Sequence, residues 1–196
     1  MVKDNYSIYI CGVGGQGIIK TSTIIGEAGM DEGLNVVMSE IHGMSQRGGS
    51  VSTEIKIGEY KSSIIEDHTS NMILGFEPLE VVRGLSKANK DTSLVFNTYP
   101  IVPAQIAGTN SYPNVDSIVS SLKDNYNKVY PVEGSKYAEE AGNILSLNMV
   151  LLGSAVAVNS FPIEKENIIK AMKNNLNEKF HKMNLKAFEY GYNAIK

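Results

Sequence analysis

The sequence predicts an α/β fold, a three-layer α/β/α sandwich around a mostly parallel sheet with room for antiparallel members and a Rossmann-like start. Short β-rich segments alternate with segments of helical periodicity along the chain. A glycine-rich turn, CGVGGQG at 11–17, joins the first expected strand to the first helix. The segment NMVLLGSAVAV at 148–158 is apolar on nearly all sides, which is typical of a helix enclosed by other elements.

The first expected unit is a strand, a glycine loop, a helix and a second strand. Residues 6–11 (YSIYIC) are rich in strand formers, and Gly33 suits the end of the helix that follows. The residues that share the apolar face of this helix are Ile18, Thr21, Ile25 and Ala28. Residues 35–40 (NVVMSE) then predict a buried strand, parallel to the first because strands joined through a crossover helix run in the same direction.

The middle of the chain continues this alternation. Residues 51–57 alternate apolar and polar side chains, which predicts a strand with one wetter face, near an edge of the sheet. Residues 98–114 hold three prolines and a glycine and predict an irregular excursion. The other expected elements are strands at 72–76, 93–97 and 128–132 and helices at 78–90, 115–126, 135–142, 143–158, 164–176 and in the C-terminal tail.

Composition narrows the function classes. With 196 residues, 42% of them apolar, the chain can bury one sizeable core, so we expect a single domain over 1–196. Its 18 basic and 21 acidic residues form no block of like charge, which argues against nucleic-acid and membrane-surface binding. We expect a cytoplasmic protein, since no segment resembles a signal peptide or approaches the roughly 20 apolar residues of a membrane span.

The single cysteine and the three histidines limit redox and metal chemistry. Cys11 alone can form neither a disulfide framework nor a cysteine-ligated iron–sulfur or zinc site within this chain. At the end of an apolar strand it is expected to be a small buried hydrophobe, although the nearby helix N-terminus could lower its pKa. His68 and His181 are isolated from carboxylates at metal-binding spacing, so we expect local structural roles and no metal site.

The glycine loop allows two interpretations. Gly12, Gly14 and Gly17 match the G-x-G-x-x-G pattern of dinucleotide-binding proteins, and Glu40 stands where such proteins place a ribose-binding acid. A helix N-terminus behind the glycines would favour a phosphate. A tight strand-to-helix turn also selects glycine whatever is bound, so this pattern alone does not decide the function.

Further motifs carry a resemblance to a known family. The glycine loop GVGGQG at 12–17 is followed by EIHGMSQRGGSV at 40–51, by NMVLLGSAV at 148–156 and by NLKAFEYGY at 184–192. In this combination the chain resembles the gamma subunits or gamma domains of 2-oxoacid:ferredoxin oxidoreductases over nearly its whole length. It is most similar to the small (beta) subunits of the indolepyruvate branch.

The resemblance implies a role in a larger complex. The family converts a 2-oxoacid, coenzyme A and oxidised ferredoxin into an acyl-CoA, carbon dioxide and reduced ferredoxin. It implies that thiamine diphosphate with its Mg²⁺ and the [4Fe–4S] clusters lie on a large partner subunit, because this chain lacks a GDG motif and has one cysteine. The chain is then inactive alone, helps complete the pocket for substrate and CoA, and meets ferredoxin through the complex. In isolation it is expected to form a homodimer through apolar surfaces meant for the partner.

The candidate site lies in the two glycine-rich motifs. Arg47, one of two arginines, could bind a phosphate, a carboxylate or the partner chain, or form an internal salt bridge. His42 is a candidate for proton transfer, or hydrogen-bonds the backbone of its loop. Gln16 either reaches a ligand or caps the following helix, and Glu40 is expected to accept from amides of residues 42–50. The residues proposed to contact a ligand, CoA or the partner are Gly12, Gly14, Gly15, Gln16, Gly17, Met44, Ser45, Gln46, Arg47, Gly48, Gly49 and Ser50.

Three alternatives stay open at this point. The substrate could be pyruvate or ketoisovalerate, since those branches share the gamma architecture. The chain could be an independent NAD- or FAD-binding oxidoreductase. It could also be an assembly module whose residues 42–50 touch only the partner.

Overall fold

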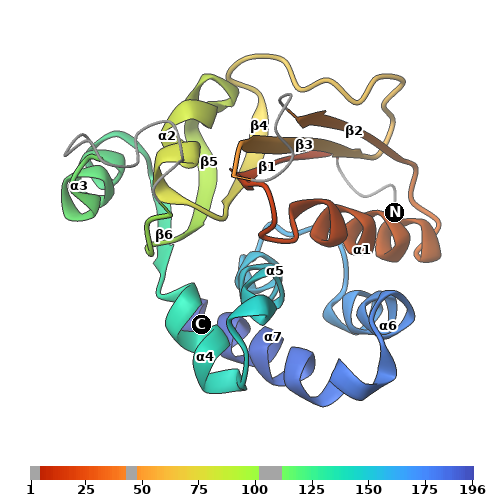
Figure 1. Cartoon of the computed structure of the whole chain (residues 1–196). Helices are drawn as coiled ribbons and strands as arrows, with labels where there is room; N and C mark the ends of the chain where they lie inside the picture. Colours follow the sequence, from red (N-terminus) through yellow and green to blue (C-terminus); the bar gives the residue numbers. More distant parts are fainter. Residues whose placement is uncertain (1–4, 43–47, 102–111) are drawn as a thin grey trace.

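A computed structural model describes residues 5–42, 48–101 and 112–196. Within these residues one sheet of six strands runs in the order β2-β3-β1-β4-β5-β6 (Figure 1). The strands are β1 (Tyr6–Val13), β2 (Val36–His42), β3 (Ser50–Ile57), β4 (Ser70–Gly75), β5 (Ala88–Asn97) and β6 (Lys128–Val132). Strands β1, β4, β5 and β6 pair in parallel, whereas β3 is antiparallel to both β1 and β2.

Helices cover both faces of the sheet, so the predicted three-layer α/β sandwich is confirmed. The helices are α1 (Ile18–Asp31), α2 (Pro78–Gly84), α3 (Val115–Asn125), α4 (Gly134–Ala141), α5 (Leu147–Ala157), α6 (Lys165–Asn175) and α7 (His181–Ile195). On one face, α2 and α3 pack through Val81, Ile118 and Leu122. On the other face lie α1 and α5, and the outer helices α4, α6 and α7 extend this layer (Figure 1).

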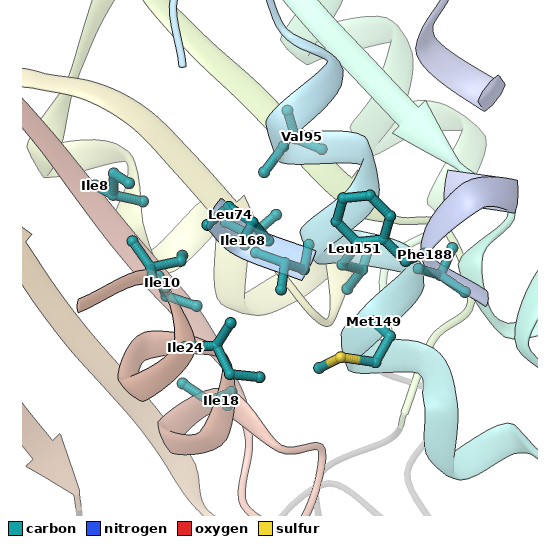
Figure 2. Close-up of a cluster of buried hydrophobic side chains, with 14 of the residues drawn as sticks. Ile8, Ile10, Ile18, Ile24, Leu74, Val95, Met149, Leu151, Ile168 and Phe188 are labelled. Carbon is teal, nitrogen blue, oxygen red and sulfur yellow. The ribbon is translucent and has the colours of Figure 1, made fainter. Parts of the chain in front are cut away.

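The main core lies between the sheet and the larger helical layer. Figure 2 shows isoleucines of β1 and α1 directed toward leucine and valine side chains of the central strands. Met149 and Leu151 of α5 and Phe188 of α7 complete this cluster and are fully buried. As predicted for the 148–158 segment, nearly every residue of α5 is buried, because the helix lies between the sheet and α7.

The first helix also forms as predicted. Its buried residues include Ile18, Thr21, Ile25 and Ala28. Gly33 adopts φ 75° and donates its backbone N–H to the Met30 carbonyl, and this left-handed turn ends the helix.

The order of the first strands differs from the prediction. Strands β1 and β2 do run in the same direction, but β3 lies between them. The chain leaves β2 through a short connection, residues 43–49, and returns as an antiparallel neighbour, which needs no crossover. The start of the fold therefore departs from a Rossmann unit, in which the first two strands are adjacent.

Burial of β2 and β3 is also reversed relative to the sequence-based prediction. Strand β2, predicted to be buried, is the edge strand, and Met38 and Ile41 are 40% and 55% exposed. Strand β3, predicted to lie near the edge, is internal and buried on both faces. Its polar face is covered because Glu54 accepts a hydrogen bond from the Ile65 backbone and Lys56 lies over the Tyr60 ring. The alternation of apolar and polar residues identified the two faces of β3, but it did not show which segment covers the polar face.

The helix expected at 78–90 is shorter than predicted. It ends at Gly84 and is followed by a 3-10 turn, Leu85–Lys87, and by β5, which begins at Ala88 and not at residue 93. The pairing of Ala88 with Ser70 of β4 draws these residues into the sheet. Among the described residues, no helix combines the length and apolar character needed to cross a bilayer.

Candidate functional site

The glycine loop lies between the end of β1 and the start of α1. Gly17 is the N-cap of α1 with φ 86°, and no side chain caps the helix there. Gly15 has φ 105° and faces open space, so both positions require the left-handed backbone that glycine adopts without strain. The N–H groups of the first turn of α1 are therefore available to a ligand, beside the positive end of the helix dipole.

The two glycine-rich motifs meet in space. The Gly14 backbone N–H donates to the Gly49 carbonyl at 2.8 Å, and the Gly48 N–H donates to the Gly14 carbonyl at 3.4 Å. This contact follows from the antiparallel register of β1 and β3, in which Val13 is opposite Ser50. Segments that are more than 30 residues apart in the sequence thus form one surface at the carboxyl edge of β1.

A pocket of about 390 Å³ opens on this surface. Its lining residues are Gly14, Gly15, Gly17, Ile18, Ile19, Glu40 and Val51. The glycine backbone and the N-terminus of α1 form a wall suited to an anionic group, whereas the isoleucine and valine side chains suit an apolar one. An elongated ligand that carries both characters fits this arrangement.

Glu40 is exposed in this pocket. The expected acceptance from amides of residues 42–50 stays a prediction, because residues 43–47 lie outside the described part of the chain. Because β3 separates β2 from β1, Glu40 lies about 4.8 Å, one strand spacing, farther from the glycine loop than the ribose-binding acid of adjacent strands. The dinucleotide fingerprint in the sequence is therefore not reproduced in space.

Gln16 and Gly12 serve the internal structure of the loop. The Gln16 side-chain oxygen accepts from the Val13 N–H at 2.6 Å, and its amide nitrogen donates to the Phe76 carbonyl at 2.9 Å. At Gly12 an added Cβ would lie 2.6 Å from Cβ of Phe76, so the position has no room for a side chain. These contacts fasten the loop to the segment that follows β4, and Gln16 does not cap α1.

The rest of the predicted site divides into two groups. Ser50 begins β3, and its hydroxyl donates to a carboxylate oxygen of Glu80 at 2.6 Å. Met44, Ser45, Gln46 and Arg47 lie outside the described residues, as does the side chain of His42 at the end of β2. Their roles stay predictions.

Sequence reasoning missed Asn148, Glu77 and Glu80. Asn148, in the first turn of α5, is 8% exposed, and its amide nitrogen is 2.7 Å from where a Cβ on Gly17 would lie. The feature of the sequence that could have indicated Asn148 is a polar amide at the start of an otherwise apolar segment. Glu77 and Glu80 are buried beside the same edge of the sheet, and nothing in the pattern EPLEVV at 77–82 distinguishes them from surface acids.

The other histidines have local roles, as predicted. A ring nitrogen of His68 is 2.9 Å from the Ala88 carbonyl oxygen, and one of His181 is 2.8 Å from that of Leu176. Within residues 5–42, 48–101 and 112–196 no three His, Cys, Asp or Glu residues are grouped so that they could hold a metal ion.

Cys11 is 2% exposed, and burial together with the nearby carboxylates Glu80 and Glu77 raises the pKa of its thiol well above the usual value. The helix N-terminus therefore does not produce a reactive thiolate here. We expect the native chain to resist alkylation by iodoacetamide at pH 8 and to react fully in guanidinium chloride. Mass spectrometry over a time course measures this, and rapid labelling of the native chain would contradict the burial of Cys11.

Comparison with known proteins places the chain in a family. The family model described as pyruvate ferredoxin/flavodoxin oxidoreductase (POR) matches residues 7–194. A protein of Methanothermobacter thermautotrophicus named indolepyruvate oxidoreductase subunit IorB is 51% identical over 191 residues, 97% of each chain. A protein of the same name from Archaeoglobus fulgidus is 39% identical over 95% of this chain and 94% of its own.

Solved structures agree in fold. The gamma subunit of a keto/oxoacid ferredoxin oxidoreductase from Geobacter sulfurreducens has a TM-score of 0.73 at 22% identity, covering 97% of this chain and 98% of its own. A 2-oxoglutarate:ferredoxin oxidoreductase from Magnetococcus marinus, solved with coenzyme A among its ligands, has a TM-score of 0.74 at 22% identity. The match covers 98% of this chain and 31% of that longer one. The resemblance found in the sequence is thus confirmed, and the chain belongs to the pyruvate ferredoxin/flavodoxin oxidoreductase family.

Proposed function

We propose that this chain is the small subunit of an indolepyruvate oxidoreductase, which converts an arylpyruvate, CoA and oxidised ferredoxin into an aryl-acetyl-CoA, carbon dioxide and reduced ferredoxin, with release of a proton. The observation that carries the proposal is the full-length identity of 51% and 39% to two subunits of that name. Relatives named 2-oxoglutarate synthase subunit KorC are also similar over the whole chain, but at 21% and 25% identity. This difference favours the indolepyruvate branch over other 2-oxoacids.

In this proposal the chain supplies a wall of the reaction pocket. The joined glycine motifs and the uncapped N-terminus of α1 suit the phosphate groups of CoA, and the apolar side of the pocket suits an uncharged part of the same molecule. Binding of CoA in a fixed orientation lowers the entropic cost of thioester formation, and closing the pocket excludes water. The displaced position of Glu40 argues against independent dinucleotide binding.

The redox groups belong, in this proposal, to a large partner subunit. A four-cysteine cluster cannot be built from the single, buried Cys11, and no metal-binding group is present among the described residues. Thiamine diphosphate with Mg²⁺ would supply the electron sink for decarboxylation on that partner, and the clusters would pass electrons to ferredoxin.

The face around the glycine loop also suits a partner chain. Ile19 beside the loop, Tyr99 after β5, and Ile144 and Leu145 before α5 are large apolar side chains that are 43–76% exposed. In this proposal the partner chain covers these side chains, because exposed apolar groups that adjoin one another mark interaction sites. The homodimer of the isolated chain and the cytoplasmic location stay predictions.

Reconstitution with the large subunit tests the proposal. The two chains are co-expressed anaerobically, and viologen reduction is measured with indolepyruvate and CoA, with the large subunit alone as the control. We expect CoA-dependent activity only when both chains are present, and a higher kcat/KM for indolepyruvate than for pyruvate, ketoisovalerate or 2-oxoglutarate.

Two results would contradict the proposal. A preference for another 2-oxoacid would assign the chain to a different branch of the family. Full activity of the large subunit alone, without binding of this chain, would remove the subunit role and require tests of nucleotide binding.

A further inference from the structure

Two buried carboxylates follow β4 at the edge of the sheet that carries the glycine loop. Glu77 is 0% and Glu80 is 2% exposed. Glu77 is the N-cap of α2, and one of its oxygens accepts from the Glu80 backbone N–H at 3.0 Å. The two acids are therefore joined directly through the first turn of one helix.

Glu77 also binds both ends of the excursion after β5. Its other carboxylate oxygen accepts from the Ile101 backbone N–H at 3.3 Å and from the Tyr112 hydroxyl. Ile101 and Tyr112 are the described residues on either side of 102–111. One carboxylate oxygen thus binds Ile101 and Tyr112 together.

Glu80 binds the second glycine-rich motif. One of its oxygens accepts from the Ser50 hydroxyl at 2.6 Å, and the other pairs with Arg83. Ser50 directly follows Gly48 and Gly49, which are hydrogen-bonded to Gly14 of the glycine loop. Tyr112, Glu77, Glu80 and Ser50 are therefore connected by hydrogen bonds, and the chain from Ser50 to Gly49 joins them to the loop that lines the pocket.

Burial of the Glu77 carboxylate is unfavourable for the free energy of folding. Burial raises its pKa above the usual value, although the hydrogen bonds from Tyr112, Glu80 and Ile101 act in the opposite direction. A glutamine could not make the same hydrogen bonds. Each carboxylate oxygen accepts from a backbone N–H, and the NH2 group that glutamine would place at one of these two positions cannot accept. A buried carboxylate that accepts hydrogen bonds from Glu80, Ile101 and Tyr112 fixes the relative positions of these residues.

We propose that Glu77 is a positioning residue for the reaction of the complex: with Glu80 it holds Ile101, Tyr112 and Ser50 in one fixed arrangement beside the glycine loop. The inference rests on the proposed function, since its effect is read in the assembled enzyme. Glu77 touches neither the pocket nor its ligand, and it acts through Ser50, Ile101 and Tyr112.

The test compares Glu77→Gln with Glu54→Gln. Glu54 is a matched control because it is also 2% exposed and also accepts a hydrogen bond from a loop backbone, but it holds the 58–69 segment. Both variants are reconstituted with saturating large subunit, and their KM for CoA, kcat and thermal unfolding are measured. We expect Glu77→Gln to raise the KM for CoA about tenfold with a smaller change in kcat, and Glu54→Gln to lower the unfolding temperature without changing the KM.

If Glu77→Gln does not fold, two smaller substitutions test the same hydrogen bonds. Tyr112→Phe and Ser50→Ala each remove one hydroxyl from the series and should each raise the KM for CoA about threefold. In the double variant the effects should be non-additive, because both residues belong to one hydrogen-bond network through the two acids although they do not touch each other. An unchanged KM in Glu77→Gln, or additive effects in the double variant, would overturn the inference, whereas an inactive wild-type complex would refute the proposed function instead.

Discussion

Replacing Gly191 with alanine is expected to destabilise the subunit by about 3 kcal/mol or more, because α5 and α7 cross at this residue in backbone contact. A Cβ on Gly191 would collide with the Val150 carbonyl oxygen and lie 2.6 Å from its carbon. Gly153 of α5 meets the backbone at Phe188 in the same way. Backbone atoms cannot rotate away as a side chain would, so the helices must separate and the core around Phe188 must open.

Gly26 provides a matched control for this prediction. It also lies inside a helix, but an added Cβ would meet only the Val36 side chain at 3.9 Å. Gly26→Ala should therefore stabilise the chain by up to about 1 kcal/mol through helix propensity. Calorimetry of the isolated subunit should show Gly191→Ala unfolding about 6–12 °C below the wild type and Gly26→Ala at or above it. Equal unfolding temperatures for the two variants would mean that the crossing of α5 and α7 is not tightly packed.

The second large effect is expected at Ile19. This side chain is 43% exposed at the uncapped N-terminus of α1 and lines the pocket. A carboxylate there interacts favourably with the helix dipole, so Ile19→Glu should leave the stability unchanged or raise it by about 0.3–1 kcal/mol. The same charge would repel a phosphate in the pocket by about 1–3 kcal/mol, which corresponds to a rise of about 5- to 150-fold in the KM for CoA.

Ile19→Gln separates charge from loss of apolar contact. The neutral variant has a similar size, so it should change the KM for CoA little while the glutamate variant changes it strongly. The measurements are the KM for CoA of each reconstituted enzyme and the affinity of each variant for the large subunit. If both variants keep a normal KM but bind the large subunit equally weakly, the pocket rim is a docking surface and not an anion site.

Much of the fold could be predicted because its elements have strong local signals. The apolar face of α1, the left-handed glycine at its end and the apolar character of α5 were all read from spacing and residue type. Burial of β2 and β3 could not be read in this way. Whether Ile41 is covered depends on strand order, and whether Glu54 is covered depends on where the 58–69 segment lies, and neither is a local property.

The candidate site was predicted in part. The sequence identified the glycine loop and the Gly48–Gly49 motif as separate segments, and the structure joins them through Gly14. Gln16, expected to cap the helix or to bind a ligand, instead fastens the loop to Phe76. Asn148 was missed because its approach to Gly17 depends on the packing of α5 under the sheet.

The sequence by itself determined the α/β class, the helix and strand types of most segments and the family, because periodicity, glycine placement and motif order are properties of the chain. Only the tertiary structure decided that β3 separates β1 from β2, and this strand order moves Glu40 away from the position of a ribose-binding acid. It also decided that two carboxylates from an ordinary helical segment, Glu77 and Glu80, are buried and bind distant loops. The physical reason is that strand order and burial depend on contacts between residues far apart in the chain, which composition and spacing do not encode.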